Sequence, residues 1–156
     1  MEPEPQPPYA SYAAIVATFL GGLTAAATVA RALGREPREL GALDLVTLSA
    51  ASFKASRTIS RDKVSSFLRE PFVEGTAYDG DERPAGEGAQ RAIGELVTCT
   101  RCVGTWVAAG LGTTQVVAPR FGRLLTWTLA AAAANDFLQS AFVALNRKSE
   151  ELSERV

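Results

Sequence analysis

The sequence predicts an all-α, polytopic membrane protein with about four transmembrane helices and one short amphipathic helix at the membrane surface. Its charges are segregated: residues 5–30 and 103–118 carry none, and residues 124–146 carry only Asp136. The overall hydrophobic fraction of 47% is ordinary, but a water-facing helix needs a polar side that these stretches lack. Uncharged stretches of this length are typical of membrane spans.

The charge pattern divides the chain into three parts. We expect a disordered tail at residues 1–11, a membrane domain at residues 12–146 and a charged tail at residues 147–156. Because no Lys or Arg precedes the first apolar run, we interpret that run as a retained helix and not as a signal peptide. The expected spans are residues 12–30, 40–56, 98–117 and 124–145, with a cytoplasmic loop at residues 57–97.

The second expected span is the least hydrophobic, with Asp44 near one end and Lys54 near the other. Complete crossing and partial re-entry both stay open for it. Small residues recur every four positions in the first and third spans, and such faces let helices approach closely in lipid. They are Thr18, Gly22, Ala26 and Ala30 in the first span, and Gly104, Ala108 and Gly112 in the third.

The expected cytoplasmic loop begins with the amphipathic piece. Val64, Phe67 and Leu68 share one helical face, and Pro71 ends the run. A short basic amphipathic helix beside a span typically lies in the headgroup layer. Residues 74–90 are rich in Gly and acidic side chains, so we expect them to form a mobile loop without packing.

The distribution of Lys and Arg predicts the orientation. Eleven of these residues fall on the side of both termini and the 57–97 loop, and five fall on the side of the two short links. Cytoplasmic segments carry the excess of Lys and Arg. We therefore expect both termini and the long loop in the cytoplasm, and the chain in the cell membrane.

Asp136 is the most informative polar residue of the expected spans. A carboxylate at the bilayer centre costs roughly 2.5–3.5 kcal/mol on insertion scales, so it should face other helices and be protonated or paired. Asn135 beside it can donate a hydrogen bond, and Asp44 lies closer to a helix end. Two interpretations stay open for Asp136: a polar clamp between helices, or a proton or cation site.

Two further groups are candidates for binding. Lys54, Arg57 and Arg61 share one helical face, with Lys63 close behind them, and they are candidates for holding anionic headgroups. The same residues also follow from the positive-inside pattern without any ligand.

Cys99 and Cys102 form a C-x-x-C pair with three interpretations: a redox pair, half of a metal site shared between two chains, or two packed thiols. Val103 stands where haem attachment needs histidine.

The composition also excludes several classes. The chain has no histidine, which removes the usual general base and the commonest metal ligand. Its net charge of −1 produces no positive electrostatic potential that would attract nucleic acid. No nucleotide loop, hydrolase triad or metal-binding helix occurs, so we expect no enzyme, no cofactor and no metal in the single chain.

Two segments resemble a known family. Residues 53–72, with Arg61-Asp62-Lys63 and the Arg69–Pro71–Phe72 ending, and residues 94–108, with the cysteine pair before Gly104 and Trp106, resemble bacterial membrane proteins catalogued as domain of unknown function 1360. Some members are linked to sporulation. The resemblance covers about residues 40–145 and implies membrane placement but no known activity. Members often carry Pro or an aromatic residue between the cysteines, where this chain has Thr100 and Arg101.

Three functional hypotheses follow. The first is an uncharacterised, non-catalytic structural or regulatory component of the cell envelope. The second is a small ion-coupled transporter that uses Asp136, and the third is a membrane thiol-redox or metal-binding protein that uses Cys99 and Cys102. The expected partners are the lipid bilayer and either further copies of the chain or other membrane proteins.

Overall fold

The computed structural model is mostly helical and describes residues 7–35, 39 and 41–153. The all-α prediction is therefore confirmed. The helices are α1 (Tyr9–Ala32), α2 (Ala42–Arg61), α3 (Ser66–Arg69), α4 (Gly88–Thr98), α5 (Thr100–Val117) and α6 (Pro119–Ser153). Parts of the two expected tails (residues 1–6 and 154–156), and Leu40 at the expected start of the second span, lie outside the described residues.

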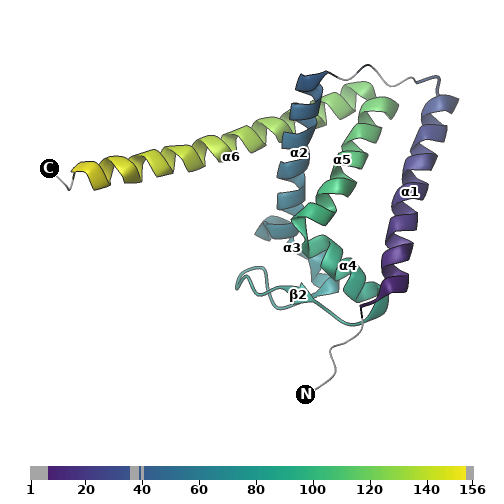
Figure 1. Ribbon diagram of the computed structural model, residues 1–156, viewed down its shortest axis with the longest axis horizontal. Coiled ribbons are helices and arrows are strands. Elements are labelled where there is room, and N and C mark those ends of the chain that lie inside the picture. The colour runs from purple at the N-terminus through teal and green to yellow at the C-terminus, as the bar shows by residue number, and fades with distance from the viewer. Residues whose placement is uncertain (1–6, 36–38, 40, 154–156) are drawn as a thin grey trace.

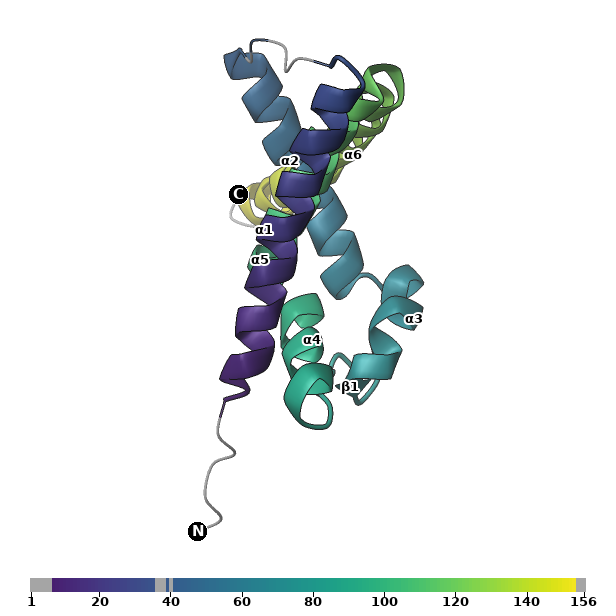
Figure 2. The same ribbon diagram turned by 90° about the vertical axis from the view of Figure 1, so that its right-hand side faces the viewer.

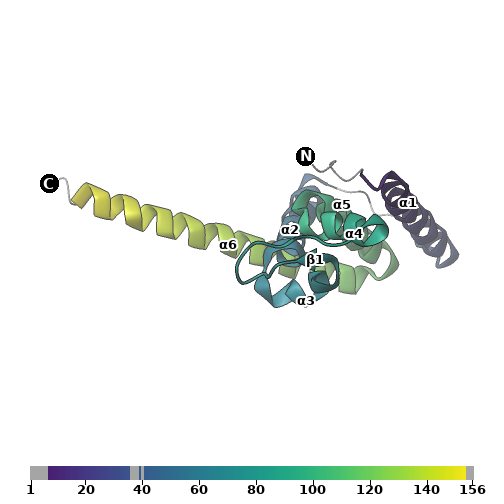
Figure 3. The same cartoon turned by 90° about the horizontal axis from the view of Figure 1, so that it is seen from below.

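The main helices form an open group. Figure 1 shows α1, α2 and α5 standing side by side, while α6 extends away from them toward the C-terminus. Seen from below in Figure 3, α1 lies at one edge of the group and α6 projects on the opposite side. Helix α1 packs against α5 through an edge-to-face contact of Phe19 with Trp106, whose ring centroids are 5.1 Å apart.

Small residues let α2, α5 and α6 approach one another. A Cβ atom added at Gly104 of α5 would meet only the Ser56 side chain of α2, at 3.7 Å, which is ordinary contact. One added at Gly122 of α6 would lie 2.5 Å from backbone atoms of Thr114 and Gln115, so only glycine fits at this turn. Helix α6 begins at Pro119, whose fixed φ suits the first position of a helix.

Helix α6 is longer than the sequence predicts. The expected fourth span ends at residue 145, but the helix continues to Ser153 because the charged tail contains no helix breaker. Lys148 and Glu151 pair along it at 3.1 Å. Every residue from Phe137 to Ser153 is exposed, so this half of α6 projects away from the other helices.

The segment between α2 and α5 is folded, which corrects the expected mobile loop. The 3₁₀ turns Lys63–Ser65 and Glu70–Phe72 flank α3, and a two-stranded hairpin of β1 (Val73–Glu74) and β2 (Arg83–Pro84) precedes α4. The expected amphipathic helix is thus a single four-residue turn within a larger unit. Figure 2 shows α3, β1 and α4 gathered at one end of the molecule.

Close contacts explain why this end segment folds. Gly75 has a φ of +88°, and a Cβ there would lie 2.6 Å from Asp81 Oδ1, which accepts a hydrogen bond from Thr76 N at 2.9 Å. A Cβ added at Gly94 of α4 would collide with the Phe72 carbonyl oxygen. Glycine at these two positions lets the hairpin close and lets α4 lie against it.

Two helices, α1 and α6, are long and apolar enough to cross a membrane. In each of them only 6% of the residues in the most apolar stretch are buried, whereas the core helix of a soluble protein is mostly buried. Among the described residues, α2 and α5 do not combine the same length with the same apolar composition. The charged residues of α2 (Asp44, Lys54, Arg57 and Arg61) account for most of its lower hydropathy, and Arg101, Gln115 and the Gly and Thr residues lower that of α5.

Candidate functional site

An ion pair joins the two helices on which the sequence places its charged candidates. Lys54 of α2 donates a hydrogen bond to Asp136 of α6, with 2.7 Å between Nζ and Oδ2. The side chains are 23% and 41% exposed, so water or lipid still reaches the carboxylate. Beside the pair, Phe53 stacks on Phe137 with ring centroids 5.5 Å apart. Charge pairing and ring stacking hold α2 and α6 together at one crossing point.

Asp136 also lines an open pocket of about 390 Å³. The pocket takes its polar groups from Arg57, Gln139 and Ser140, and its apolar wall from the two stacked rings. Arg57 is exposed and forms no ion pair with another described residue. With Lys54 already paired, the site carries one uncompensated positive charge.

The other charged candidates are distributed along α2 and do not join the pair. Asp44 accepts a hydrogen bond from the Gly41 backbone N–H at 3.0 Å, which satisfies a free donor at the start of α2. Lys63 lies over the Tyr78 ring, 4.8 Å from its centroid. Arg61 is exposed at the end of α2. Asn135 is exposed and, within the described chain, makes no side-chain hydrogen bond to Asp136.

Arg69 is a central residue that sequence reasoning did not single out as a site. Its side chain is fully buried and pairs with Glu82, with 2.9 Å between Nη2 and Oε2. Its Nη1 donates to the Ile59 carbonyl at 2.6 Å and to the Asp62 carbonyl at 3.2 Å, both at the end of α2. Arg69 therefore caps α2 and ties it to the hairpin. In the sequence, the feature that could have identified Arg69 is its position in the Arg69–Pro71–Phe72 motif of the family resemblance.

A second polar contact ties α1 to the end segment. Tyr12 of α1 donates a hydrogen bond to Glu95 of α4, and Arg91 pairs with the same carboxylate at 3.0 Å. The hydrogen bond from Tyr12, with a smaller contribution from Arg91, holds the pKa of Glu95 below its ordinary value, although partial burial opposes the shift. The N-terminal helix is thus anchored at the end where the hairpin lies.

Cys99 and Cys102 form a disulfide at the junction of α4 and α5, with 5.2 Å between their Cα atoms. Cys99 is the residue that caps the start of α5, and its Sγ accepts a hydrogen bond from the Cys102 backbone N–H at 3.3 Å. Cys102 is exposed and Cys99 is partly buried. Within the residues that the structure describes, no three potential metal ligands come together.

Fold and sites define a small helical protein with apolar outer faces, a helix-crossing ion pair and a cysteine pair. The sequence profile described as "Protein of unknown function (DUF1360)" matches residues 47–142, and the chain belongs to that family. The matched range runs from within α2 into α6 and leaves α1 outside it.

Two relatives from Bacillus subtilis (strain 168) align over 104 residues each. The chain is 29% identical to "UPF0713 protein YngL", over 65% of this chain and 80% of the relative. It is 32% identical to "Sporulation protein YjcA", over 60% of this chain and 85% of the relative. No solved structure matches the chain.

Proposed function

We propose that this chain is a multi-pass protein of the cell membrane and acts there as a non-catalytic structural or regulatory component. The observation that carries this proposal is an inverted distribution of side chains. The buried apolar residues are mostly Ala, and the buried polar ones are mostly Ser and Thr. Large apolar side chains instead face outward, including Leu20 and Leu23 of α1, and Trp127 and Phe142 of α6.

This inversion suits lipid and opposes water. Soluble monomers rarely expose contiguous apolar patches of more than a few hundred Å². In a bilayer the large side chains meet acyl chains, and helices associate through small residues and short polar contacts. The α2–α5 contact at Ser56 and Gly104, and the α5–α6 hydrogen bond from Gln115 to Thr126 at 2.9 Å, are contacts of that kind.

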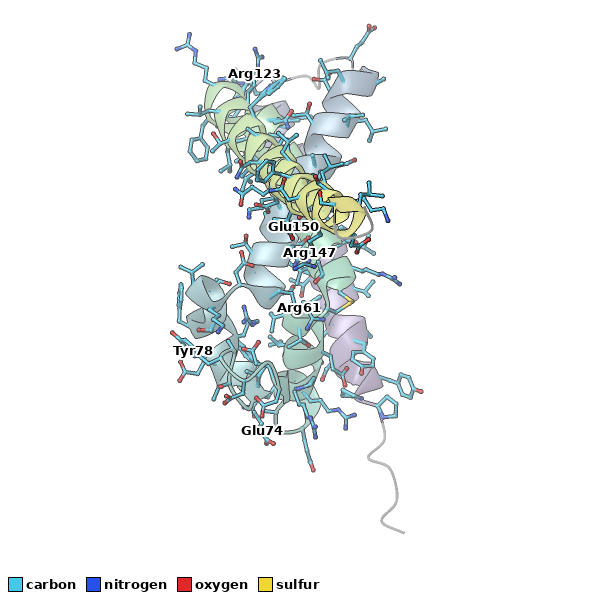
Figure 4. All side chains as sticks on the ribbon, turned by 90° about the vertical axis from the view of Figure 1, so that its left-hand side faces the viewer. Arg61, Glu74, Tyr78, Arg123, Arg147 and Glu150 are labelled. Atoms are coloured by element: carbon cyan, nitrogen blue, oxygen red, sulfur yellow. A yellow bond between two sulfur atoms is a disulfide. The ribbon has the colours of Figure 1, made fainter. Side chains whose placement is uncertain are left out.

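The proposed topology has four crossings, by α1, α2, α5 and α6. Figure 4 agrees with it for the upright helices α1, α2 and α5, because Arg123 lies at one end of the molecule and Glu74 and Tyr78 lie toward the other. In the same view Arg147 and Glu150 of α6 lie between these two ends, because α6 runs crosswise to the other helices; its 35 residues extend ~52 Å against a hydrocarbon core of ~30 Å, so the proposed crossing requires α6 to turn toward the direction of α2 and α5. The excess of Lys and Arg assigns both termini and residues 57–97 to the cytoplasm.

In this setting the Lys54–Asp136 pair acts as a polar clamp. Two opposite charges 2.7 Å apart lower the cost of placing either one within the membrane. Ion-coupled transport is the second candidate function, because Asp136 lines an open pocket that an ion can enter; a cation there would have to displace Lys54 from the carboxylate and meet the positive charge of Arg57. The name of the relative YjcA makes sporulation the first process in which to seek a phenotype of this chain.

Fractionation and cysteine labelling test the proposal. We expect the chain to remain in membranes washed with alkaline carbonate and to dissolve in detergent. In a variant without Cys99 and Cys102, a Tyr78→Cys thiol should react with an impermeant reagent only after the cells are opened. Release by carbonate would contradict membrane insertion, and labelling of Tyr78→Cys on intact cells would contradict the orientation.

A further inference from the structure

The two sulfurs of the Cys99–Cys102 disulfide lie in different environments. Cys99 stands before the first turn of α5, where its Sγ accepts the Cys102 backbone N–H at 3.3 Å. Cys102 lies in that first turn and is exposed. A nucleophile from solution therefore reaches Cys102 more easily, while charge is better stabilised on Cys99.

The start of α5 favours a thiolate at Cys99. Free backbone N–H groups and the positive end of the helix dipole stabilise negative charge there and lower the pKa of a thiol. In thiol–disulfide exchange, the sulfur with the lower pKa leaves faster. The geometry thus separates the sulfur that is attacked from the sulfur that leaves.

A purely stabilising role does not account for this disulfide. It encloses only Thr100 and Arg101 between the cysteines, and a disulfide stabilises a protein chiefly by closing long loops of the unfolded chain. In the proposed topology the pair also lies at the cytoplasmic end, where disulfides are rare and are transient, catalytic or sensory when they occur.

We propose that Cys99 and Cys102 form a thiol–disulfide exchange site that accepts two electrons from a dithiol. A thiolate of the dithiol attacks Cys102 Sγ, forms a mixed disulfide and breaks the bond to Cys99, which leaves as a thiolate. The second thiolate of the dithiol then attacks the donor's own sulfur and releases Cys102. The dithiol becomes a disulfide, and its two protons are shared between the reduced cysteines and the solvent.

The partner that fits this site is a redox-active dithiol on a protein or a small molecule. Such a partner needs access only to Cys102, which is exposed at the corner between α4 and α5. The inference extends beyond the membrane role; its argument from the cytoplasmic position rests on the proposed topology, whereas the difference between the two sulfurs belongs to the local unit of disulfide and helix start.

Redox titration tests the site directly. The full-length protein in detergent is equilibrated with mixtures of reduced and oxidised dithiothreitol, free thiols are alkylated, and the intact mass is measured. We expect reversible conversion between disulfide and dithiol. A pair that stays oxidised in excess reduced dithiothreitol, or one that stays reduced in excess oxidised dithiothreitol, would overturn the proposal.

Single variants test the division of roles between the sulfurs. Cys99→Ser keeps an oxygen that can cap α5 and leaves Cys102 to form a mixed disulfide with a small aromatic disulfide, whereas Cys102→Ser leaves Cys99 alone. We expect the alkylation rate of Cys99 to rise with a midpoint at lower pH than that of Cys102. In urea, the Cys99 midpoint should move up to the ordinary range of a thiol. Circular dichroism checks that both variants remain helical. Equal profiles in the folded variants would refute the assignment of Cys99 as the leaving sulfur.

Discussion

The bundle of α1, α2, α5 and α6 and the end segment of residues 62–98 are built on different principles. The bundle holds Ser, Thr and Ala inside and exposes its large apolar side chains, with few polar contacts between its helices. The end segment instead contains a fully buried Arg69, two ion pairs and a close backbone approach at Gly94. One region is organised by small residues, and the other by specific polar partners.

In the proposed membrane topology, this contrast follows from two different solvents. In lipid, apolar side chains gain nothing from burial, so close approach and a few hydrogen bonds hold the helices together. In water, a short segment with little apolar core needs satisfied polar groups to stay folded. The boundary between the two regions falls at the end of α2, where Arg69 reaches the Ile59 and Asp62 carbonyls.

The largest effect is expected from Arg69→Ala. Removing this guanidinium leaves Glu82, only 14% exposed, as an unpaired carboxylate and uncaps α2. Breaking a buried pair in this way costs about 3–5 kcal/mol. Arg61→Ala is the matched control, because Arg61 is exposed and should change stability by only about 0.5 kcal/mol.

Limited proteolysis and thermal unfolding in detergent measure this difference. Trypsin should cut the Arg69→Ala protein rapidly within residues 62–98, while the bundle helices keep their helicity. Equal protease resistance in the Arg69→Ala and Arg61→Ala proteins would show that the buried pair does not organise the end segment.

A smaller effect is expected at Gly94. The new Cβ of Gly94→Ala meets the Phe72 carbonyl oxygen, and forcing α4 off the hairpin should cost about 1–3 kcal/mol. Gly110→Ala in α5 is the control, since a Cβ there meets nothing within 4 Å and helix propensity favours Ala by up to about 1 kcal/mol. Gly94→Ala should lower the unfolding temperature and Gly110→Ala should raise it. A loss of stability in both variants would contradict the contrast between the regions.

Mutation of the Lys54–Asp136 clamp should change stability less than mutation of Arg69 or Gly94, because the charges of the clamp are partly exposed. Asp136→Leu leaves Lys54 unpaired and should weaken the α2–α6 contact by about 1 kcal/mol, whereas Asp136→Asn keeps a hydrogen-bond acceptor. Replacing both residues, as Lys54→Met with Asp136→Leu, should restore stability because no charge is left alone. Disulfide cross-linking between cysteines introduced on α2 and α6 measures the contact.

The same variants separate the clamp from the transporter hypothesis. A folded, abundant Asp136→Asn protein that loses a pH-dependent flux would make ion-coupled transport the leading function. Retention of function in this variant, together with loosening in Asp136→Leu, would support the clamp.

The sequence predicted the helical class and the family because both depend on local patterns: uncharged stretches, and the motif around Arg69, Pro71 and the cysteines. It did not predict that Lys54 pairs with Asp136, since the two positions are 82 residues apart and the pairing depends on how α6 crosses α2. The fold of residues 74–90 was also missed. Its Gly and acidic residues are typical of loops, but here Gly75 and Asp81 close a hairpin through contacts that no periodic pattern encodes.

The smallest effect is expected at the Tyr12–Glu95 contact, which couples the two regions. The pKa of Glu95 is lowered in the folded chain, so this carboxylate stabilises the fold above the unfolded pKa of about 4.5, and the contribution is lost as the pH falls through the lower folded value. Tyr12→Phe removes the main cause of the shift and should make the unfolding temperature slightly less sensitive to acid below about pH 4.5, with little change in the Arg91–Glu95 pair. Thermal melts of both proteins between neutral and acidic pH measure the difference. Tyr9→Phe is the control, because Tyr9 lies one turn away with its ring largely exposed and is not bonded to Glu95. If Tyr9→Phe and Tyr12→Phe gave the same pH dependence, α1 would be held to the bundle by its apolar contacts alone, and the end segment would not anchor it.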